Sequence, residues 1–267
     1  MTGRGNLLII CVFFAGVLIG LMAPCLVQGD GNRDRDMLFQ VSTMASLMEG
    51  AYEGTMSYGD LSRWGDHGIG TFHGLDGEMI AIEGEFYQIT ADGSARPATG
   101  EMTAPFAMVT WFEPDLLIFV RESGSYPEFS ASVGQQIPDP GIFSAVRITG
   151  TFPSMVTRSV PAYKEPYPRL VDAVRNQSVF FLNGTEGTLF GFWSPESSDG
   201  MSVPGFHLHY LTRDRQAGGH VLDFSLENAT VELDLMPGYS VCLPLGSAVS
   251  GDYRGNETEL GLVEGGR

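Results

Sequence analysis

Residues 205–220 combine a strand pattern, a turn and three of the chain's five histidines, and they restrict the possible folds more than any other stretch. The segment reads GFHLHYLTRDRQAGGH and continues as VLDFSLE. Side chains at i and i+2 lie on one face of a strand, so FHLHYL points His207 and His209 the same way. The turn returns the chain as a second strand, which brings His220 opposite or diagonal to that pair. The sequence therefore predicts an antiparallel hairpin with three imidazoles on one face.

These three histidines are candidate metal ligands. Three imidazoles on adjacent strands leave room for water or substrate, as in a catalytic site rather than a closed structural one. Imidazole binds zinc, iron, nickel and copper alike, so the ligand type leaves the ion open. A cupin-type iron site would need a glutamate shortly after the first pair, but residues 210–215 offer only Asp214. Asp223 is out of phase with His220, so we expect it to serve the fold.

The rest of the chain is also rich in strand and turn signals. Its 35 glycines and 15 prolines are spread over 267 residues, which favours many turns between short strands. LDGEMIAIEGEFYQITADGSARP predicts a β-meander, and PFAMVTWF and DLLIFV predict further strands. IFSAVRITGTF and SMVTRSV read as paired strands. SVFFLNGTEGTLFGFW reads as a hairpin with its turn at Asn183 and Gly184.

A few helices complete this pattern. Apolar residues recur at helical spacing over residues 38–52, and PEFSASVGQQI and PRLVDAVRN predict short helices. The predicted fold class is therefore α+β and predominantly β, with two sheet-based lobes.

The first 29 residues differ from the rest. Residues 6–29 carry no charge, follow Arg4 and end in small residues, which is typical of an export signal. Left uncut, residues 6–28 are long enough to anchor the chain in a membrane, and Arg4 favours a domain outside it. The predicted organisation is a signal peptide or anchor (1–29), a charged linker (30–36), an N-terminal lobe (37–142) and a C-terminal lobe with the histidines (143–267).

Charge narrows the classes of partner. The net charge of −17 opposes binding to nucleic acid and to anionic lipid heads, so we expect membrane contact only through an uncleaved leader. Lys164 is the only lysine, and it lies in the proline-flanked loop PAYKEPYP. Schiff-base chemistry could run only there, which argues against it.

Several segments, in order, resemble the alpha-acetolactate decarboxylase family. The likeness lies in LMEGAYEGTMSYGDL, GIGTFHGLDGEMIAIEGEFYQI, RITGTF, TRSVPAYKEPYPRL, LFGFW and VPGFHLHYLTRDRQAGGHVLDF, and it covers about residues 47–235. The resemblance implies a zinc enzyme that converts 2-acetolactate, a 2-hydroxy-3-keto acid, to acetoin and carbon dioxide. It also implies a homodimer with an N-terminal mixed sheet, helices, and a C-terminal β domain that holds the metal.

The same resemblance implies roles for individual residues. Glu78 of GLDGE and Arg158 of TRSVP fall on catalytic positions, with Arg158 also binding substrate, and Thr71 falls on a substrate pocket position. A catalytic glutamate near the family's C-terminus falls on Glu264 in LVEGGR, with Glu257 and Glu259 as rivals. The implied metal ligands are His207, His209 and His220.

The chemistry fits these residue types. Loss of carbon dioxide leaves an enediolate, which a metal can stabilise as a Lewis acid. A guanidinium such as Arg158 matches the substrate carboxylate. A buried carboxylic acid with a raised pKa, Glu78 or Glu264, can then supply a proton. Without the resemblance, the residues also fit another three-histidine metalloenzyme (a hydro-lyase or cupin-like oxygenase) or a non-catalytic exported metal-binding protein.

Overall fold

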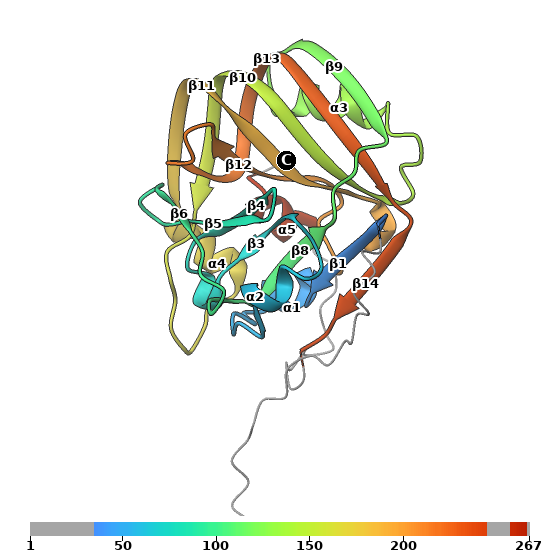
Figure 1. The fold of residues 1–267 in the computed structure, drawn as a ribbon. Helices are drawn as coiled ribbons and strands as arrows, with labels where there is room; N and C mark the ends of the chain where they lie inside the picture. The colour runs from blue at the N-terminus through green and yellow to red at the C-terminus, as the bar shows by residue number, and fades with distance from the viewer. Residues whose placement is uncertain (1–34, 245–256, 266–267) are drawn as a thin grey trace, which may run out of the picture.

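Two β-sheets, one above the other in Figure 1, form the body of the protein. The structure is a computed structural model in which residues 35–244 and 257–265 are described. The lower sheet is mixed, because β1 and β14 pair in parallel and its other neighbours are antiparallel. Its strands, in spatial order, are β14 (Gly238–Cys242), β1 (Met37–Val41), β8 (Phe106–Thr110), β3 (His67–Thr71), β4 (Glu78–Ile82), β5 (Glu85–Ile89) and β6 (Ala95–Pro97). This is the mixed sheet that the resemblance implies, built from N-terminal strands with β14 added from near the C-terminus.

The upper sheet is antiparallel and partly closed. Its strands, in order, are β10 (Phe143–Ser159), β11 (Ser178–Ser194), β12 (Gly205–Thr212), β13 (Gly218–Met236) and β9 (Leu116–Ser123). Because β10 also pairs with β13, the four strands β10 to β13 close on themselves. Register shifts along the β10–β13 pair allow these long strands to bend, as bulges do.

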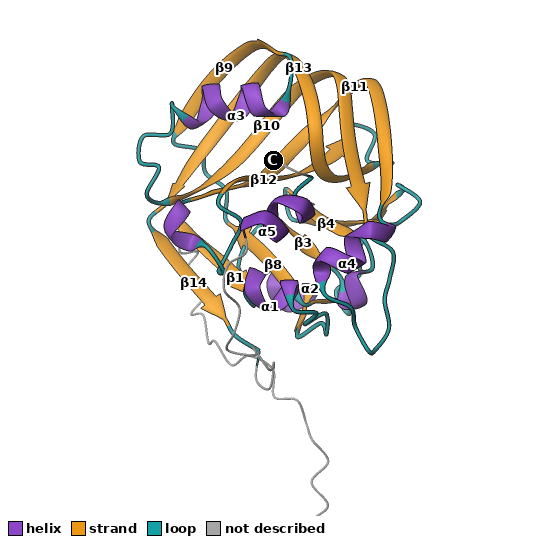
Figure 2. Ribbon diagram, turned by 180° about the vertical axis from the view of Figure 1, so that it is seen from behind, coloured by secondary structure: helices purple, strands orange, loops and turns teal. Residues whose placement is uncertain are grey.

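Short helices and one small ribbon surround the sheets. Figure 2 shows α3 against the upper sheet, α1, α2 and α4 beside the lower one, and α5 between the two sheets. The helices are α1 (Met44–Met48), α2 (Tyr58–Leu61), α3 (Tyr126–Gly134), α4 (Leu170–Ala173) and α5 (Glu257–Val263). The 3₁₀ turns are η1 (His73–Leu75), η2 (Val174–Asn176) and η3 (Glu196–Ser198), and β2 (Met56–Ser57) pairs with β7 (Thr103–Ala104).

Residues 143–159 and 178–194 each form one continuous strand, where the sequence predicted paired strands and a hairpin. Both predictions were wrong. β10 and β11 pair with each other along nearly their whole length. Asn183 and Gly184 make no hairpin turn, because Asn183 and Thr185 both pair with β10. Gly184, with φ of 60°, lies where this ladder is interrupted at Pro153. A proline costs little at such an irregularity, and pairing on both sides of β10 outweighs the local turn signal.

The helix expected over residues 38–52 forms only at residues 44–48, and the rest of that prediction is wrong. The chain there forms strand β1 and breaks at Ser42, which has φ of 63°. Helix α1 then begins at Met44, and Thr43 caps it, because its hydroxyl accepts from the Ser46 amide. β1 lies inside the lower sheet and is buried along nearly its whole length, including Gln40. A strand buried on both faces shows no alternation, so its apolar residues matched a helical spacing by coincidence.

Other expectations are confirmed. The predicted meander is β4, β5 and β6, and the two predicted short helices are α3 and α4 with η2. The sheets exchange one strand each across residue 142, because β9 pairs with β13 and β14 pairs with β1. The division into lobes 37–142 and 143–267 therefore differs from the division into sheets, and it stays a prediction.

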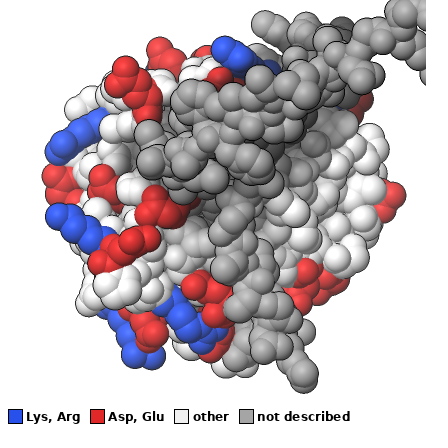
Figure 3. Space-filling model, turned by 90° about the horizontal axis from the view of Figure 1, so that it is seen from below, with Lys and Arg blue, Asp and Glu red and all other residues white. Residues whose placement is uncertain are grey.

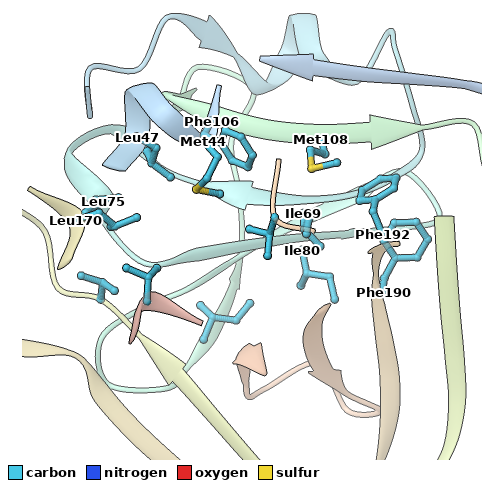
Figure 4. Close-up of a cluster of buried hydrophobic side chains, with 14 of the residues drawn as sticks. Met44, Leu47, Ile69, Leu75, Ile80, Phe106, Met108, Leu170, Phe190 and Phe192 are labelled. Carbon is cyan, nitrogen blue, oxygen red and sulfur yellow. The ribbon is translucent and has the colours of Figure 1, made fainter. Parts of the chain in front are cut away.

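The largest buried apolar cluster lies between the two sheets. Figure 4 shows that side chains from the lower sheet, α1, α4 and β11 meet there. Burial of this apolar surface holds the sheets together and fixes the distance between them. The labelled members are Met44, Leu47, Ile69, Leu75, Ile80, Phe106, Met108, Leu170, Phe190 and Phe192.

The surface carries both signs of charge. On the face shown in Figure 3, the basic side chains of the described residues are scattered among acidic ones. Within residues 35–244 and 257–265, no helix is long and apolar enough to cross a membrane. The predicted leader and most of the linker lie outside the described residues.

Candidate active site

The three histidines of the predicted hairpin lie together on one face of β12 and β13. His209 and His220 are directly opposite each other in the register. Each of the three rings offers a nitrogen, and these nitrogens lie within 4.8 Å of one another. All three side chains are buried. Leu208 and Tyr210, which alternate with the histidines of β12, pack on the other face of that strand in a separate core. The predicted hairpin and its shared histidine face are confirmed.

The lower sheet fixes the ring of His209. Its Nδ1 lies 2.7 Å from the carbonyl oxygen of Met79 on β4. A carbonyl only accepts, so Nδ1 carries the proton and donates it, and the lone pair is left on Nε2. Burial, followed by the neighbouring His207, holds the pKa of His209 well below its usual range. The ring is therefore neutral, which is the form that binds a metal.

A buried ion pair stands beside the histidines. Arg158 is opposite His220 in the β10–β13 register, and its Nη1 donates to Oε1 of Glu78 at 2.8 Å. Glu78 Oε2 lies 3.7 Å from Nε2 of His209. Glu78 and Arg158 are 7% and 5% exposed. The pair therefore joins the two sheets at the histidine cluster.

The environment of Glu78 favours its neutral form. Burial raises the pKa of Glu78 to about 7, and the nearby Glu264 adds to the rise. Arg158 acts in the opposite direction but does not outweigh the burial. A carboxyl of this kind can exchange a proton near neutral pH.

Glu264 also reaches the site. It follows α5 directly, and its Oε2 lies 3.5 Å from Nε2 of His220. Nη2 of Arg158 donates to the carbonyl oxygen of Val263 at 3.3 Å. Of the two rivals, Glu259 pairs with Arg169 instead, and the side chain of Glu257 lies outside the described part. The structure thus brings Glu264, and not Glu259, next to the histidines.

Thr71 and a tight turn position Glu78. Thr71 on β3 is opposite Glu78 on β4, and its hydroxyl donates to the Gly77 carbonyl at 2.7 Å. Gly77 has φ of 86°, a conformation that favours glycine. A Cβ at Gly77 would stand 2.2 Å from the carbonyl oxygen of Ile89, so no larger residue fits there without a backbone shift.

A small cavity of about 40 Å³ opens at these residues. Its polar side is formed by Thr71, Glu78, Arg158, Glu264 and the three histidines. Its other side is apolar and comes from α1, α4, the β3–β4 segment, β8, the end of β10 and the end of α5. These apolar residues are Met44, Leu47, Gly70, Leu75, Phe106, Val160, Leu170 and Val263. The arrangement suits a small ligand with oxygen atoms at one end and alkyl groups at the other.

Sequence reasoning missed this apolar wall and the Met79 carbonyl. Met44 and Leu170 read as ordinary core positions, and nothing in their local pattern distinguishes a cavity wall from a core. A backbone carbonyl leaves no signal in the residue type. The resemblance could have pointed to Leu170, because TRSVPAYKEPYPRL ends on it.

Three further titratable residues that the sequence brought into question, Asp223, His67 and His73, lie outside the cavity. Asp223 accepts from the Tyr126 amide at the start of α3, so its expected structural role is confirmed. His67 lies at the other end of β3, where its Nδ1 bonds to Asp66 at 2.8 Å. His73 is half-exposed and its Nδ1 accepts from the Gly54 amide. None of these three lines the cavity.

The residues present fit a metal ion that is bound by imidazole nitrogens. Three imidazole nitrogens converge, one of them fixed as a neutral acceptor by a backbone carbonyl, and two carboxyl groups lie just beyond them. With the acid–arginine pair and the apolar wall, fold and site define a class of protein. It is a small-molecule enzyme whose buried three-histidine cluster can hold a metal.

Comparison with known proteins names the family. The family model for alpha-acetolactate decarboxylase matches residues 38–252. An alpha-acetolactate decarboxylase of Methanosarcina mazei is 43% identical over 239 residues, covering 90% of this chain and 82% of that protein. One from Bacillus subtilis is 36% identical over 219 residues, covering 82% of this chain and 86% of that protein. This chain belongs to the alpha-acetolactate decarboxylase family, and it is therefore an enzyme and a carboxy-lyase.

A solved structure agrees with the assignment. The crystal structure of alpha-acetolactate decarboxylase from Bacillus subtilis strain 168 superposes with a TM-score of 0.81 at 35% identity. The superposition covers 86% of this chain and 99% of that one. The described fold is thus the family's fold across nearly the whole length of that relative.

Proposed function

We propose that this chain converts 2-acetolactate (2-hydroxy-2-methyl-3-oxobutanoate) to acetoin and carbon dioxide, with zinc held by His207, His209 and His220. The buried Glu78–Arg158 pair beside the three histidines is the observation that carries the proposal. A zinc ion there would supply Lewis-acid stabilisation of the negative charge that develops on the substrate's oxygen atoms, which is the charge of an enediolate. The remaining steps fall to side chains of the chain itself.

Arg158 binds the carboxylate that leaves. Its guanidinium is buried, and its Nε has no hydrogen-bond partner among the described residues. Two of its other nitrogens are held by Glu78 and by the Val263 carbonyl, which fixes the plane of the group. A fixed guanidinium can orient a carboxylate so that the bond to be broken is correctly placed.

Glu78 supplies the proton that replaces carbon dioxide. With a pKa of about 7 the carboxyl is substantially protonated at neutral pH, and it lies at the histidine cluster. The proton passes from its oxygen to the enediolate carbon, and the product is acetoin. Glu264 assists by keeping Glu78 protonated, since a second carboxylate nearby disfavours the first one's charge. Burial of the cavity limits competing protonation by bulk water.

Acetoin formation tests the proposed function. The purified protein is loaded with zinc and given racemic 2-acetolactate, and the rate is corrected for spontaneous decarboxylation. We expect a rate well above background that a chelator abolishes and added zinc restores. No rate from a folded protein that holds one zinc per chain would overturn the proposed function. Consumption of oxygen would instead indicate an oxygenase on the same site.

We also propose that the chain is exported, or held at the membrane by residues 6–28, and that it works as a homodimer. The apolar leader after Arg4 supports export, and the family resemblance supports the dimer. Detection of the mature N-terminus outside the cell membrane, and a solution mass of two chains, would be the expected results. A chain found only in the cytoplasm, or one that stays monomeric at high concentration, would contradict these two proposals.

A further inference from the structure

One arginine outside the cavity connects three of the elements that line the cavity. Arg169, immediately before α4, donates to both oxygens of Glu259 on α5, at 3.1 and 2.8 Å. Its Nη2 also donates to Oε1 of Glu49, directly after α1, at 2.8 Å. Figure 2 shows α5 beneath the upper sheet and next to α4. A single guanidinium thus ties α1, α4 and α5 together.

Each of these three elements forms part of the cavity wall. Leu170, the residue after Arg169, lines the cavity from α4, and Met44 and Leu47 line it from α1. Val263 lines it from α5, and Glu264 follows directly. The residues that Arg169 joins therefore stand within a few positions of the cavity surface.

α5 depends on such contacts for its position. A helix of seven residues is too short to be stable alone. Leu260 and Val263 pack into the core between the sheets, and Arg158 holds the Val263 carbonyl. Glu259 and Val263 are four residues apart, so they lie on neighbouring turns of one helix face. Arg169 and Arg158 hold the two turns in succession.

We propose that Arg169 is a positioning residue for the decarboxylation: by gripping Glu259 it fixes α5 at the cavity and thereby holds Glu264 beside His220. The two-oxygen contact supports this, because a bidentate pair fixes orientation as well as distance. Its effect on turnover rests on the proposed function, but its effect on α5 does not. The Arg169 side chain is 42% exposed, so its ion pairs contribute little to global stability.

Kinetics give the first test, in the zinc-loaded full chain. For Arg169→Ala we expect kcat to fall about tenfold or more, because a small misplacement of a catalytic group is costly. Zinc content and thermal stability should stay close to those of the wild type. Arg169→Lys, which keeps one ion pair but not the fork, should fall between the two. The matched control is Arg175→Ala, which should leave kcat unchanged. The Arg175 side chain is 75% exposed and pairs with Asp172 one turn away.

A double-mutant cycle assigns the effect to the pair. Glu259→Gln should reproduce the loss seen in Arg169→Ala, and the double variant should lose little more than either one. Additive losses would mean that Arg169 does not act through Glu259, and would overturn the proposal.

Hydrogen exchange tests the contact without any substrate. Amides of residues 257–263 should exchange faster in Arg169→Ala than in the wild type or in Arg175→Ala. If exchange and kcat both match the wild type, the proposal is overturned. If the wild type forms no acetoin, the proposed function fails, and exchange alone decides whether Arg169 holds α5.

Discussion

At the scale of the residue, the site is set by what surrounds each titratable group. His209 is neutral because it is buried and donates to a backbone carbonyl, so its other nitrogen is free to bind. Glu78 keeps an ion pair with Arg158, yet burial still raises its pKa to about 7. The same small cavity therefore holds a neutral base, a fixed cation and a carboxyl that can give up a proton.

Glu78→Gln removes the proposed proton donor. The amide keeps the volume, and its oxygen can still accept from Arg158, but it has no acidic proton to transfer. We expect zinc content like that of the wild type and turnover lower by roughly 10²–10⁴-fold, the usual contribution of a general acid. Zinc content and acetoin formation are measured on the same sample. Normal turnover would exclude Glu78 as the proton donor and leave Glu264 as the candidate.

At the scale of the element, the site depends on turns that local sequence specifies. Gly77 ends the segment between β3 and β4, and its amide donates to the carbonyls of Leu75 and Val160. Its left-handed conformation sets the direction in which Glu78 enters β4. On the upper sheet, the turn between β12 and β13 brings His220 opposite His209.

Gly77→Ala should disturb this turn and displace Glu78. Gly77→Ala combines a strained φ with a Cβ 2.2 Å from the Ile89 carbonyl oxygen, so the backbone must move and Glu78 with it. Gly84→Ala is the control, because Gly84 has φ of 82° but no atom within 4 Å of an added Cβ. We expect Gly84→Ala to cost about 1–2 kcal/mol of stability with activity kept. Gly77→Ala should cost more and lose activity, and equal effects in thermal unfolding and kinetics would contradict this account.

The elements also show which parts of the fold and the site could be predicted from the sequence. Alternation in FHLHYL and the turn after it were enough to place His207, His209 and His220, because those contacts lie within one hairpin. β10 and β11 were misread because their length depends on pairing between segments far apart in the chain. The cavity wall at Met44 and Leu170 has the same cause: the convergence of α1 and α4 on the histidines is a property of the tertiary packing.

At the scale of the whole molecule, one buried acid links stability to pH. Asp234 on β13 is buried and accepts from the Glu113 amide, and burial raises the pKa of Asp234 to about 7. Asp115, Asp36 and Glu113 add smaller repulsive contributions. The folded state thus holds a proton that the unfolded chain loses near pH 4. The stability that depends on this proton is fully present below about pH 4. It is lost as the pH rises from there through about 7.

Asp234→Asn tests this link. The amide resembles the protonated acid and cannot ionise, so the variant should lose less stability than the wild type between pH 5 and pH 8. Between pH 5 and the folded pKa of about 7, at about 1.36 kcal/mol per unit, the difference should be at most roughly 3 kcal/mol. Denaturant unfolding at the two pH values measures it. Parallel losses in both proteins would mean that Asp234 ionises normally in the folded state.

If the three-histidine site performs the decarboxylation, loss of one histidine must abolish both metal binding and turnover, and His207→Ala removes one. Zinc content and acetoin formation from 2-acetolactate are measured together for wild type and variant. We expect the variant to fold, to bind no zinc and to form acetoin only at the spontaneous rate. Wild-type turnover by a metal-free His207→Ala protein would contradict it.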